Sequence, residues 1–356
     1  MENKEDIRLM KGNEAFAEAG IQAGADAYFG YPITPQSEVL EYLSREMPKR
    51  NRIVLQAESE VAAINMIYGA SGAGARVMTS SSSPGISLMQ EGLSYIAAAE
   101  LPCLVLNINR GGPGLGTIQP SQGDYFQATK GGGHGDYYLI VLAPASVQEM
   151  ADFVFLGFEL ADKYRNPVMM LADGAIGQMM EKVIFHKREI KKISKPWATR
   201  GKSKQRSRNI ITSLFIKPEK MEEVNNKLVK KYEEINKNEV RYQEIMTEDA
   251  EYLLVAYGLS ARISHKTVLS AREKGLKVGL LRPITLYPFP KKRLYELAQN
   301  LKGAMSLEMN AGQMVEDIRL AVEGKIPVSH YGRMGGIIPT PEEALEKLEV
   351  FIKNNN

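Results

Sequence analysis

The chain has 356 residues, 44% of them hydrophobic and 24% charged, which is typical of a globular protein with room for two domains and a connector. A formal net charge of +3 is too small to favour nucleic acid or an anionic membrane as a partner. The first residues lack the apolar core of a signal peptide and no apolar run approaches a membrane span, so we expect a cytoplasmic protein.

Strands and helices are predicted to alternate up to residue 184. Short apolar runs predict strands near residues 27–30, 52–56, 76–80, 102–108, 138–143 and 167–172. Apolar residues at helical spacing predict helices near residues 12–24, 36–47, 59–73, 84–98 and 146–163. This alternation predicts a doubly wound, mostly parallel α/β sheet with helices on both faces.

A rigid turn, Tyr31-Pro-Ile-Thr-Pro35, follows the first of these strands. Its prolines hold the backbone extended around Thr34, because a residue before proline is pushed out of the helical region. A hydroxyl on such a turn is suited to hydrogen bonding a small ligand. The alternative is an ordinary strand-to-helix turn in which Ser37 caps the helix.

The next strand leads into Glu58-Ser-Glu60, at the start of a helix whose later turns are small and apolar. Ser59 can cap this helix, and the residues three, four and seven positions after Glu60 are apolar and share its face. Glu60 should therefore face the domain interior just past a strand end, where open α/β sheets bind ligands. The alternative is a carboxylate that only complements the helix dipole.

Two more polar stretches follow strands. The hydroxyl run Thr79–Ser83 is expected to form a loop, with Ser83 and Pro84 as the cap and first turn of the next helix. Arg110 opens a loop with nine glycines up to Gly135, and such a long loop in a compact domain is usually functional or disordered. Arg110 can donate two hydrogen bonds to a carboxylate, or it can be a surface arginine in a mobile loop.

The order and spacing of these stretches are specific: Tyr31-Pro-Ile-Thr-Pro35, Ala57-Glu-Ser-Glu60, Thr79–Gly85 and Arg110-Gly-Gly-Pro113. They resemble the α-type chain of 2-oxoacid:ferredoxin oxidoreductases, which are thiamine-diphosphate enzymes, over nearly the whole chain. The loop Gly114–Gln127 is most similar to that of the branched-chain (3-methyl-2-oxobutanoate) subfamily. The resemblance implies a thiamine-diphosphate-binding-like domain followed by a transketolase C-terminal-like domain.

The resemblance also implies roles for individual residues. Glu60, the Glu followed by Val-Ala-Ala, would be the catalytic residue that hydrogen-bonds the aminopyrimidine ring of thiamine diphosphate, and Glu58 is the less favoured choice. Coenzyme A would take the acyl group as co-substrate. The remaining predicted site residues are the substrate-binding pair Thr34 and Arg110 and the cofactor-binding pair Ser83 and Pro84.

Parts that such an enzyme requires are missing from the sequence. The Gly-Asp-Gly motif that ligates diphosphate through Mg²⁺ is absent, with Gly123-Asp124, Gly135-Asp136 and Asp173-Gly174 as the nearest fragments. The single Cys103, expected to be buried, forms no disulfide framework and cannot hold a [4Fe-4S] cluster, and the four histidines are scattered, so we expect no metal site here. We expect partners instead: a β subunit with the thiamine diphosphate and Mg²⁺ motif, a γ subunit, an iron–sulfur ferredoxin-like subunit and external ferredoxin.

The expected substrate follows from the loop after Arg110. It offers Leu115, Ile118 and Gln119, and no Lys or Arg before Lys130, so it lacks a cation for the distal carboxylate of 2-oxoglutarate. This favours a medium-sized apolar side chain, as in 3-methyl-2-oxobutanoate. The alternatives are a 2-oxoglutarate- or pyruvate-specific family member and a non-catalytic assembly subunit.

The composition changes after residue 185. Residues 186–208 hold ten Lys or Arg, and residues 219–243 follow a charged, amphipathic helical pattern. A solvated connector is the favoured interpretation and a partner-docking surface the alternative. We predict a pyrimidine-binding domain at 1–185, the connector at 186–248 and the transketolase C-terminal-like domain at 249–356, to which no catalytic residue is assigned. Strands in that last domain are predicted at 253–257, 278–281 and 304–308.

Overall fold

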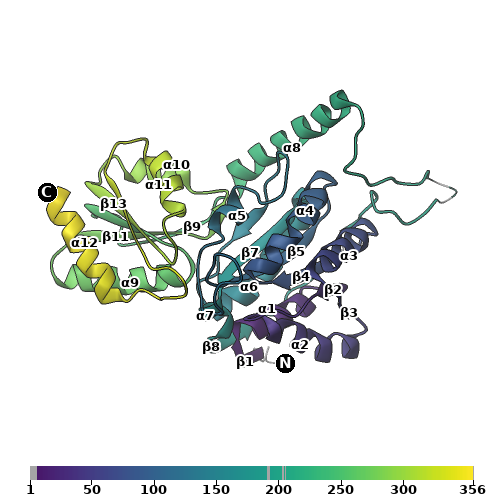
Figure 1. Cartoon of the computed structure of the whole chain (residues 1–356), viewed down its shortest axis with the longest axis horizontal. Coiled ribbons are helices and arrows are strands. Elements are labelled where there is room, and N and C mark those ends of the chain that lie inside the picture. Colours follow the sequence, from purple (N-terminus) through teal and green to yellow (C-terminus); the bar gives the residue numbers. More distant parts are fainter. Residues whose placement is uncertain (1–5, 191–192, 203, 205, 356) are drawn as a thin grey trace.

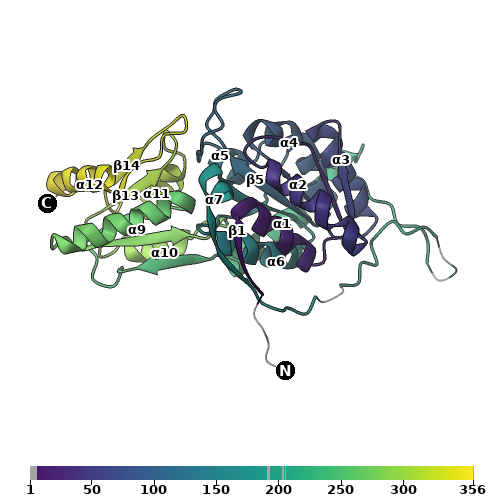
Figure 2. The same cartoon turned by 90° about the horizontal axis from the view of Figure 1, so that it is seen from below.

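The computed structural model describes residues 6–190, 193–202, 204 and 206–355. Two α/β units lie side by side along the long axis of the molecule (Figure 1 and Figure 2). The first unit comprises residues 6–185 and the second unit residues 242–355. The first is linked to the second by a segment without helix or strand elements in its described residues and by the long helix α8 (Pro218–Asn238). In the described part of the chain, no helix combines the length and the apolarity needed to cross a bilayer.

The first unit is built on parallel strands: β2 (Ala27–Gly30), β3 (Ile53–Gln56), β4 (Val77–Ser81), β5 (Cys103–Asn109), β6 (Ile140–Leu142) and β7 (Pro167–Asp173). They form a seven-stranded sheet with the order β12-β6-β7-β5-β4-β2-β3, in which β12 (Thr285–Tyr287) comes from the second unit. Strands β4, β5 and β7 are buried along their whole length, as expected for apolar runs at the centre of a parallel sheet.

Helices cover both faces of this sheet. Helix α1 packs against α6 and α2, and α3 packs against α4 on the opposite face (Figure 1). The predicted helices are confirmed to within two residues at either end, and the doubly wound parallel sheet is confirmed. The helices are α1 (Gly12–Gln22), α2 (Ser37–Glu46), α3 (Glu60–Gly72), α4 (Ser83–Ala98), α5 (Tyr125–Thr129), α6 (Val147–Tyr164) and α7 (Gly174–Gln178), with a short 3-10 turn at Pro48–Arg50.

The second unit has a sheet of its own, in the order β14-β13-β10-β11-β9. Its elements are β9 (Tyr242–Ile245), β10 (Tyr252–Val255), β11 (Val278–Pro283), β13 (Gly303–Glu308) and β14 (Val328–Gly332), with α9 (Gly258–Glu273), α10 (Lys291–Leu297), α11 (Met314–Val322) and α12 (Pro341–Asn355). Helices α9 and α12 pack together, as do α10 and α11. The three strands predicted here are confirmed.

Three features differ from the predictions or were not predicted. Strand β1 (Asp6–Lys11) pairs antiparallel with β8 (Met180–Phe185) in a separate ribbon whose partners lie far apart in the sequence. The helix predicted to run to residue 243 ends at Asn238, because residues 242–245 form β9 and pair with β11, and tertiary pairing overrides the local helical pattern. Strand β12 leaves the second unit to pair with β6. The domain boundaries at residues 185 and 248 stay a prediction.

Candidate active site

The predicted site residues lie at one edge of the first sheet. The strand order reverses at β2, which has β3 on one side and β4 on the other. Doubly wound sheets bind ligands outside the carboxyl ends of their strands at such a reversal. Because β2, β3, β4 and β5 are parallel, the segments that follow them come to the same edge. These segments carry Thr34, Glu60, Ser83 with Pro84, and Arg110.

Glu60 is the first residue of α3 and its side chain is buried, with 6% of its surface exposed. The Oγ atom of Ser59 accepts a hydrogen bond from the Ala62 N–H at 3.2 Å, which confirms the predicted cap. The Glu60 carboxylate lies against Gly85 in the first turn of α4: a Cβ atom there would come within 2.5 Å of Glu60 Oε1 and 2.0 Å of Ser81 Oγ. Only glycine leaves this space open. Glu58, by contrast, is exposed.

The hydroxyl run is placed differently from the prediction. Thr79 and Ser80 lie in β4, within the strand predicted near residues 76–80, and Ser81 belongs to the same strand and not to a loop, because its backbone pairs with β5. Ser82 takes the N-cap position of α4, and Ser83 is already helical, so the expected Ser83 cap is wrong. The Oγ atoms of Ser81 and Ser82 are buried and have no hydrogen-bond partner in the described part of the protein. Buried hydroxyls without partners are unusual in folded proteins.

Arg110 and Thr34 are in direct contact. Arg110 Nη1 donates to the Thr34 carbonyl oxygen at 2.9 Å, and Nη2 donates to the Leu115 carbonyl oxygen at 3.0 Å. The Arg110 Nε–H is buried and has no partner among the described residues. Thr34 itself is exposed.

Ser83 links this pair to the Glu60 side of the site. Its Oγ accepts a hydrogen bond from the Arg110 backbone N–H at 3.0 Å. Two residues further along α4, Gly85 contacts the Glu60 carboxylate. The first turn of α4 therefore contacts both Glu60, the candidate for proton transfer, and the backbone of Arg110, the candidate for binding a carboxylate.

A cavity of about 370 Å³ opens beside Arg110, between the two units. Asp124 lines it, burial raises the pKa of its carboxyl group, and the Asn107 Nδ2–H donates to its Oδ2 at 2.9 Å. The second unit contributes the segments Met309–Ala311, Gln313 and Met334-Gly335. These residues were not predicted as site residues, because no catalytic residue was expected in that domain. One signal was available: Met309 directly follows β13, at the carboxyl end of a strand.

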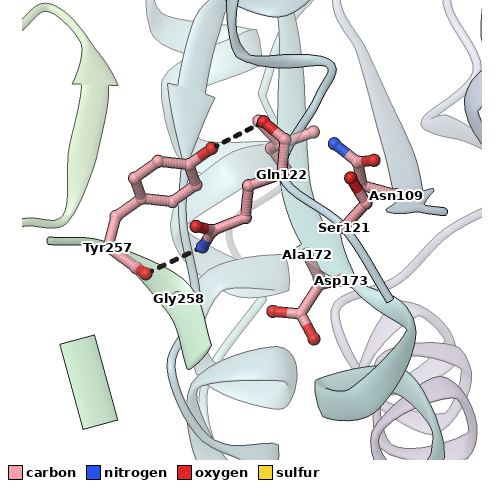
Figure 3. Close-up of a pocket in the computed structure, with 8 residues that line it drawn as sticks. Asn109, Ser121, Gln122, Ala172, Asp173, Tyr257 and Gly258 are labelled. Atoms are coloured by element: carbon pink, nitrogen blue, oxygen red, sulfur yellow. Dashed lines mark hydrogen bonds between the residues drawn. The ribbon is translucent and has the colours of Figure 1, made fainter. Parts of the chain in front are cut away.

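Gln122 joins the loop after Arg110 to the second unit (Figure 3). Its Nε2 donates to the Tyr257 carbonyl oxygen at 2.9 Å, and its Oε1 accepts from Ser260 Oγ at 2.8 Å and from the Met309 N–H at 3.0 Å. The Tyr257 hydroxyl donates back to the Gln122 carbonyl oxygen at 3.3 Å. These contacts fix the position of the loop relative to the second sheet.

Asp173, at the end of β7, lies at the same junction (Figure 3). Its Oδ1 accepts from the N–H groups of Ala175 and Ile176, and its Oδ2 accepts from the Leu259 N–H at 3.3 Å. Burial raises the pKa of Asp173 to about 6 despite these hydrogen bonds, because the charged form loses its hydration.

Two family models account for almost the whole chain. Residues 18–247 match the pyruvate flavodoxin/ferredoxin oxidoreductase, thiamine diP-bdg, family, and residues 250–344 match the pyruvate:ferredoxin oxidoreductase core domain II. This chain belongs to the 2-oxoacid:ferredoxin oxidoreductase family. The Ketoisovalerate oxidoreductase subunit VorB of Methanothermobacter marburgensis is 51% identical over 98% of this chain and 99% of its own length. The chain is thus an α-type subunit of a 2-oxoacid:ferredoxin oxidoreductase, as the sequence motifs predicted.

Solved structures agree with this family assignment. A 2-oxoglutarate:ferredoxin oxidoreductase from Magnetococcus marinus, with 2-oxoglutarate, coenzyme A and succinyl-CoA bound, matches 98% of this chain with a TM-score of 0.85 and 27% identity. The match covers 66% of that longer chain. A split gene transketolase matches 98% of this chain and 99% of its own, with a TM-score of 0.63 and 12% identity, which shows a shared fold. The thiamine-diphosphate-binding-like and transketolase-like fold class is confirmed.

Proposed function

We propose that this subunit forms the pyrimidine half of a split active site for the thiamine-diphosphate-dependent oxidative decarboxylation of a 2-oxoacid, with 3-methyl-2-oxobutanoate favoured. A β subunit would supply the diphosphate and Mg²⁺ site. A γ subunit and an iron–sulfur ferredoxin-like subunit would complete the complex, with external ferredoxin as electron acceptor and coenzyme A as acyl acceptor. The observation that carries this proposal is the first turn of α4, which contacts the buried Glu60 carboxylate through Gly85 and the Arg110 loop through Ser83.

The residues around Glu60 fit an aminopyrimidine ring. Such a ring carries donors and acceptors at its edge, and the site offers a buried carboxylate together with the hydroxyls of Ser81 and Ser82, which have no partner among the described residues. When bound, thiamine diphosphate supplies the carbanion that attacks the 2-oxoacid carbonyl and holds the electrons left by decarboxylation. Ser83 and Pro84 line the neighbouring cavity and would approach the cofactor from the helix side.

The Glu60 carboxyl group would hydrogen-bond a nitrogen of the aminopyrimidine ring. This bond would favour the tautomer of the ring that can remove the C2 proton of the cofactor. The burial of Glu60 suits this task, since a carboxylate with little exposure to water exchanges a proton with a ligand instead of with solvent. The packing of Gly85 fixes where the carboxylate can lie. Position matters as much as acidity, because general acid–base catalysis requires hydrogen-bond reach to the proton transferred.

Arg110 would bind the substrate carboxylate. A guanidinium group has five N–H donors, and two of them are engaged with the Thr34 and Leu115 carbonyl oxygens. These bonds hold the side chain in place and use one hydrogen of each terminal nitrogen, so that each terminal nitrogen has a second N–H to donate to an anion. Thr34, on the exposed turn beside it, would add a hydroxyl contact. The non-catalytic alternative does not explain why the Glu60 carboxylate and the Arg110 backbone both contact the first turn of α4.

The test is a substrate panel with the complete complex and with this chain alone. We expect 2-oxoacid-dependent reduction of viologen or ferredoxin only by the complex, with a higher kcat/KM for 3-methyl-2-oxobutanoate than for 2-oxoglutarate or pyruvate. Faster turnover of 2-oxoglutarate would refute the substrate assignment. Activity of the isolated chain would refute the split site.

A further inference from the structure

The cavity beside Arg110 has one wall from each unit. Arg110, Ser83 and Asp124 belong to the first unit, and Met309, Ala311 and Met334 belong to the second. We call the last three the apolar wall. A ligand whose carboxylate pairs with Arg110 would extend its other end into the space that this wall bounds.

The apolar wall is held at a fixed position relative to Arg110. The loop that carries Met334 packs directly on the residue after Arg110: a Cβ atom on Gly111 would come within 3.0 Å of both the Gly335 carbonyl carbon and the Gly336 nitrogen. The Gln122 N–H donates to the Met309 carbonyl oxygen at 3.0 Å, so the other end of the wall is fastened to the same loop. A wall held at both ends can select a ligand by size and polarity.

The polar groups of the second unit near the cavity are already engaged. Asn310 Nδ2 donates to the Gln122 carbonyl oxygen at 2.7 Å, and its Oδ1 accepts from the Gly312 N–H at 2.8 Å. Gln313 Nε2 donates to the Gly123 carbonyl oxygen at 2.7 Å, and its Oε1 accepts from the Phe126 N–H at 2.8 Å. The apolar surface that remains for a ligand on this side comes from Ala311 and Met334, which are exposed, whereas the Met309 side chain is buried.

The charges around the cavity also favour a ligand with an apolar end at the wall. Among the described residues that line it, Arg110 is the only cation and Asp124 the only carboxylic acid. A second carboxylate on the substrate would therefore meet no positive partner at the apolar wall and would lose hydration without compensation. A branched aliphatic end would lose only unfavourable contact with water.

We infer that the second unit determines substrate specificity through the apolar wall, which accepts the aliphatic side chain of a 2-oxoacid and rejects a distal carboxylate. The inference rests on the proposed function, because it takes Arg110 as the site of the substrate carboxylate. It gives the second unit a part in the reaction that its position outside the first sheet does not suggest.

The experiment compares Met334→Arg with wild type in the complete complex, using 3-methyl-2-oxobutanoate and 2-oxoglutarate as substrates. A cation at the wall should raise the ratio of kcat/KM for 2-oxoglutarate over the branched acid by about tenfold or more. Ile337→Arg is the matched control, since Ile337 follows in the same loop, is 50% exposed and does not line the cavity. The control should leave the ratio unchanged.

A second variant covers the case in which Met334→Arg does not assemble. Ala311→Phe should lower kcat/KM for 3-methyl-2-oxobutanoate at least fivefold more than for pyruvate, because it narrows the cavity without adding charge. An unchanged substrate ratio in an assembled Met334→Arg complex, or equal losses for both acids in Ala311→Phe, would overturn the role of the wall. A wild-type complex that turns over no 2-oxoacid would instead refute the proposed function itself.

Discussion

Gly85 offers the sharpest perturbation of the site, because an added methyl group would meet the Glu60 carboxylate directly. The new Cβ of Gly85→Ala would lie 2.5 Å from Glu60 Oε1, 3.0 Å from Glu60 Cδ and 2.0 Å from Ser81 Oγ. Non-bonded carbon and oxygen atoms do not come so close, so both side chains must move. The atoms in the way are the ends of side chains and not backbone, so the helix itself can form.

The effects on stability should largely cancel. Alanine in place of glycine inside a helix is favoured by about 1 kcal/mol, and Gly85 is the third residue of α4. Forcing two side chains off their preferred rotamers costs about 0.5–1.5 kcal/mol each. The net change in the free energy of unfolding is then on the order of 1 kcal/mol, which is small for a folded domain. The carboxylate, however, is displaced by roughly 1 Å, and a shift of that size can lower a rate by about 10²-fold.

The assay is the 2-oxoacid-dependent reduction of viologen by complexes that contain Gly85→Ala or wild-type subunit. We expect kcat to fall by about 10²-fold while the melting temperature changes by only a few degrees. Gly69→Ala is the matched control: Gly69 lies in α3, the helix that begins with Glu60, and a Cβ there would meet no atom within 4 Å. Wild-type kcat in a folded Gly85→Ala complex would show that the Glu60 position does not matter to the reaction.

Two further predictions concern charge. Burial raises the pKa of Asp173 from 3.8, its value in an unfolded chain, to about 6 in the folded chain. The protonated side chain therefore stabilises the fold below pH 3.8, and this contribution to the free energy of unfolding, roughly 3 kcal/mol, is lost as the pH rises through 6. The melting temperature of the wild-type complex should therefore fall relative to that of Asp173→Asn between pH 5 and pH 7.5, and a pH-independent difference would contradict this. Arg110→Lys should raise the KM for the 2-oxoacid at least tenfold, because an ammonium group lacks the planar fork that reaches both carbonyl oxygens and keeps further donors for a substrate. Arg319→Lys, at an exposed position on α11, should leave KM unchanged, and equal KM values for the two variants would argue against a substrate contact by Arg110.

The local spacing of apolar residues was enough to predict much of the fold. Strand and helix alternation in the first 184 residues follows from apolar periodicity, and the burial of Cys103 follows from the apolar strand around it. Burial raises the pKa of the Cys103 thiol to about 12, which fits an unreactive core residue. Thr34, Glu60 and Arg110 each follow a predicted strand, and parallel strands bring their carboxyl ends to one edge of the sheet, so the position of these residues at that edge follows from the predicted strands.

What the sequence did not predict depends on contacts between distant segments. Strands β1 and β8 pair across about 170 residues, and β12 leaves its own unit to extend the first sheet. Neither pairing has a local signal, since each joins segments that lie far apart in the sequence. The same holds for the cavity, whose second wall includes Met309 and Met334. Ser83 is an example at the level of one residue. Its position before proline suggested a helix N-cap, but its hydroxyl oxygen accepts a hydrogen bond from the backbone N–H of Arg110, which is distant in the sequence.

The measurement that tests the central claim most directly is the turnover number of complete complexes carrying Glu60→Gln or Glu58→Gln. The two residues are neighbours of the same type, but Glu60 is buried beside Gly85 and Glu58 is exposed. If Glu60 is the proton-holding residue, Glu60→Gln should lower kcat by about 10²–10⁴-fold and Glu58→Gln should leave it within twofold of wild type. Full activity in an assembled Glu60→Gln complex would contradict the proposal that this subunit supplies the catalytic carboxylate.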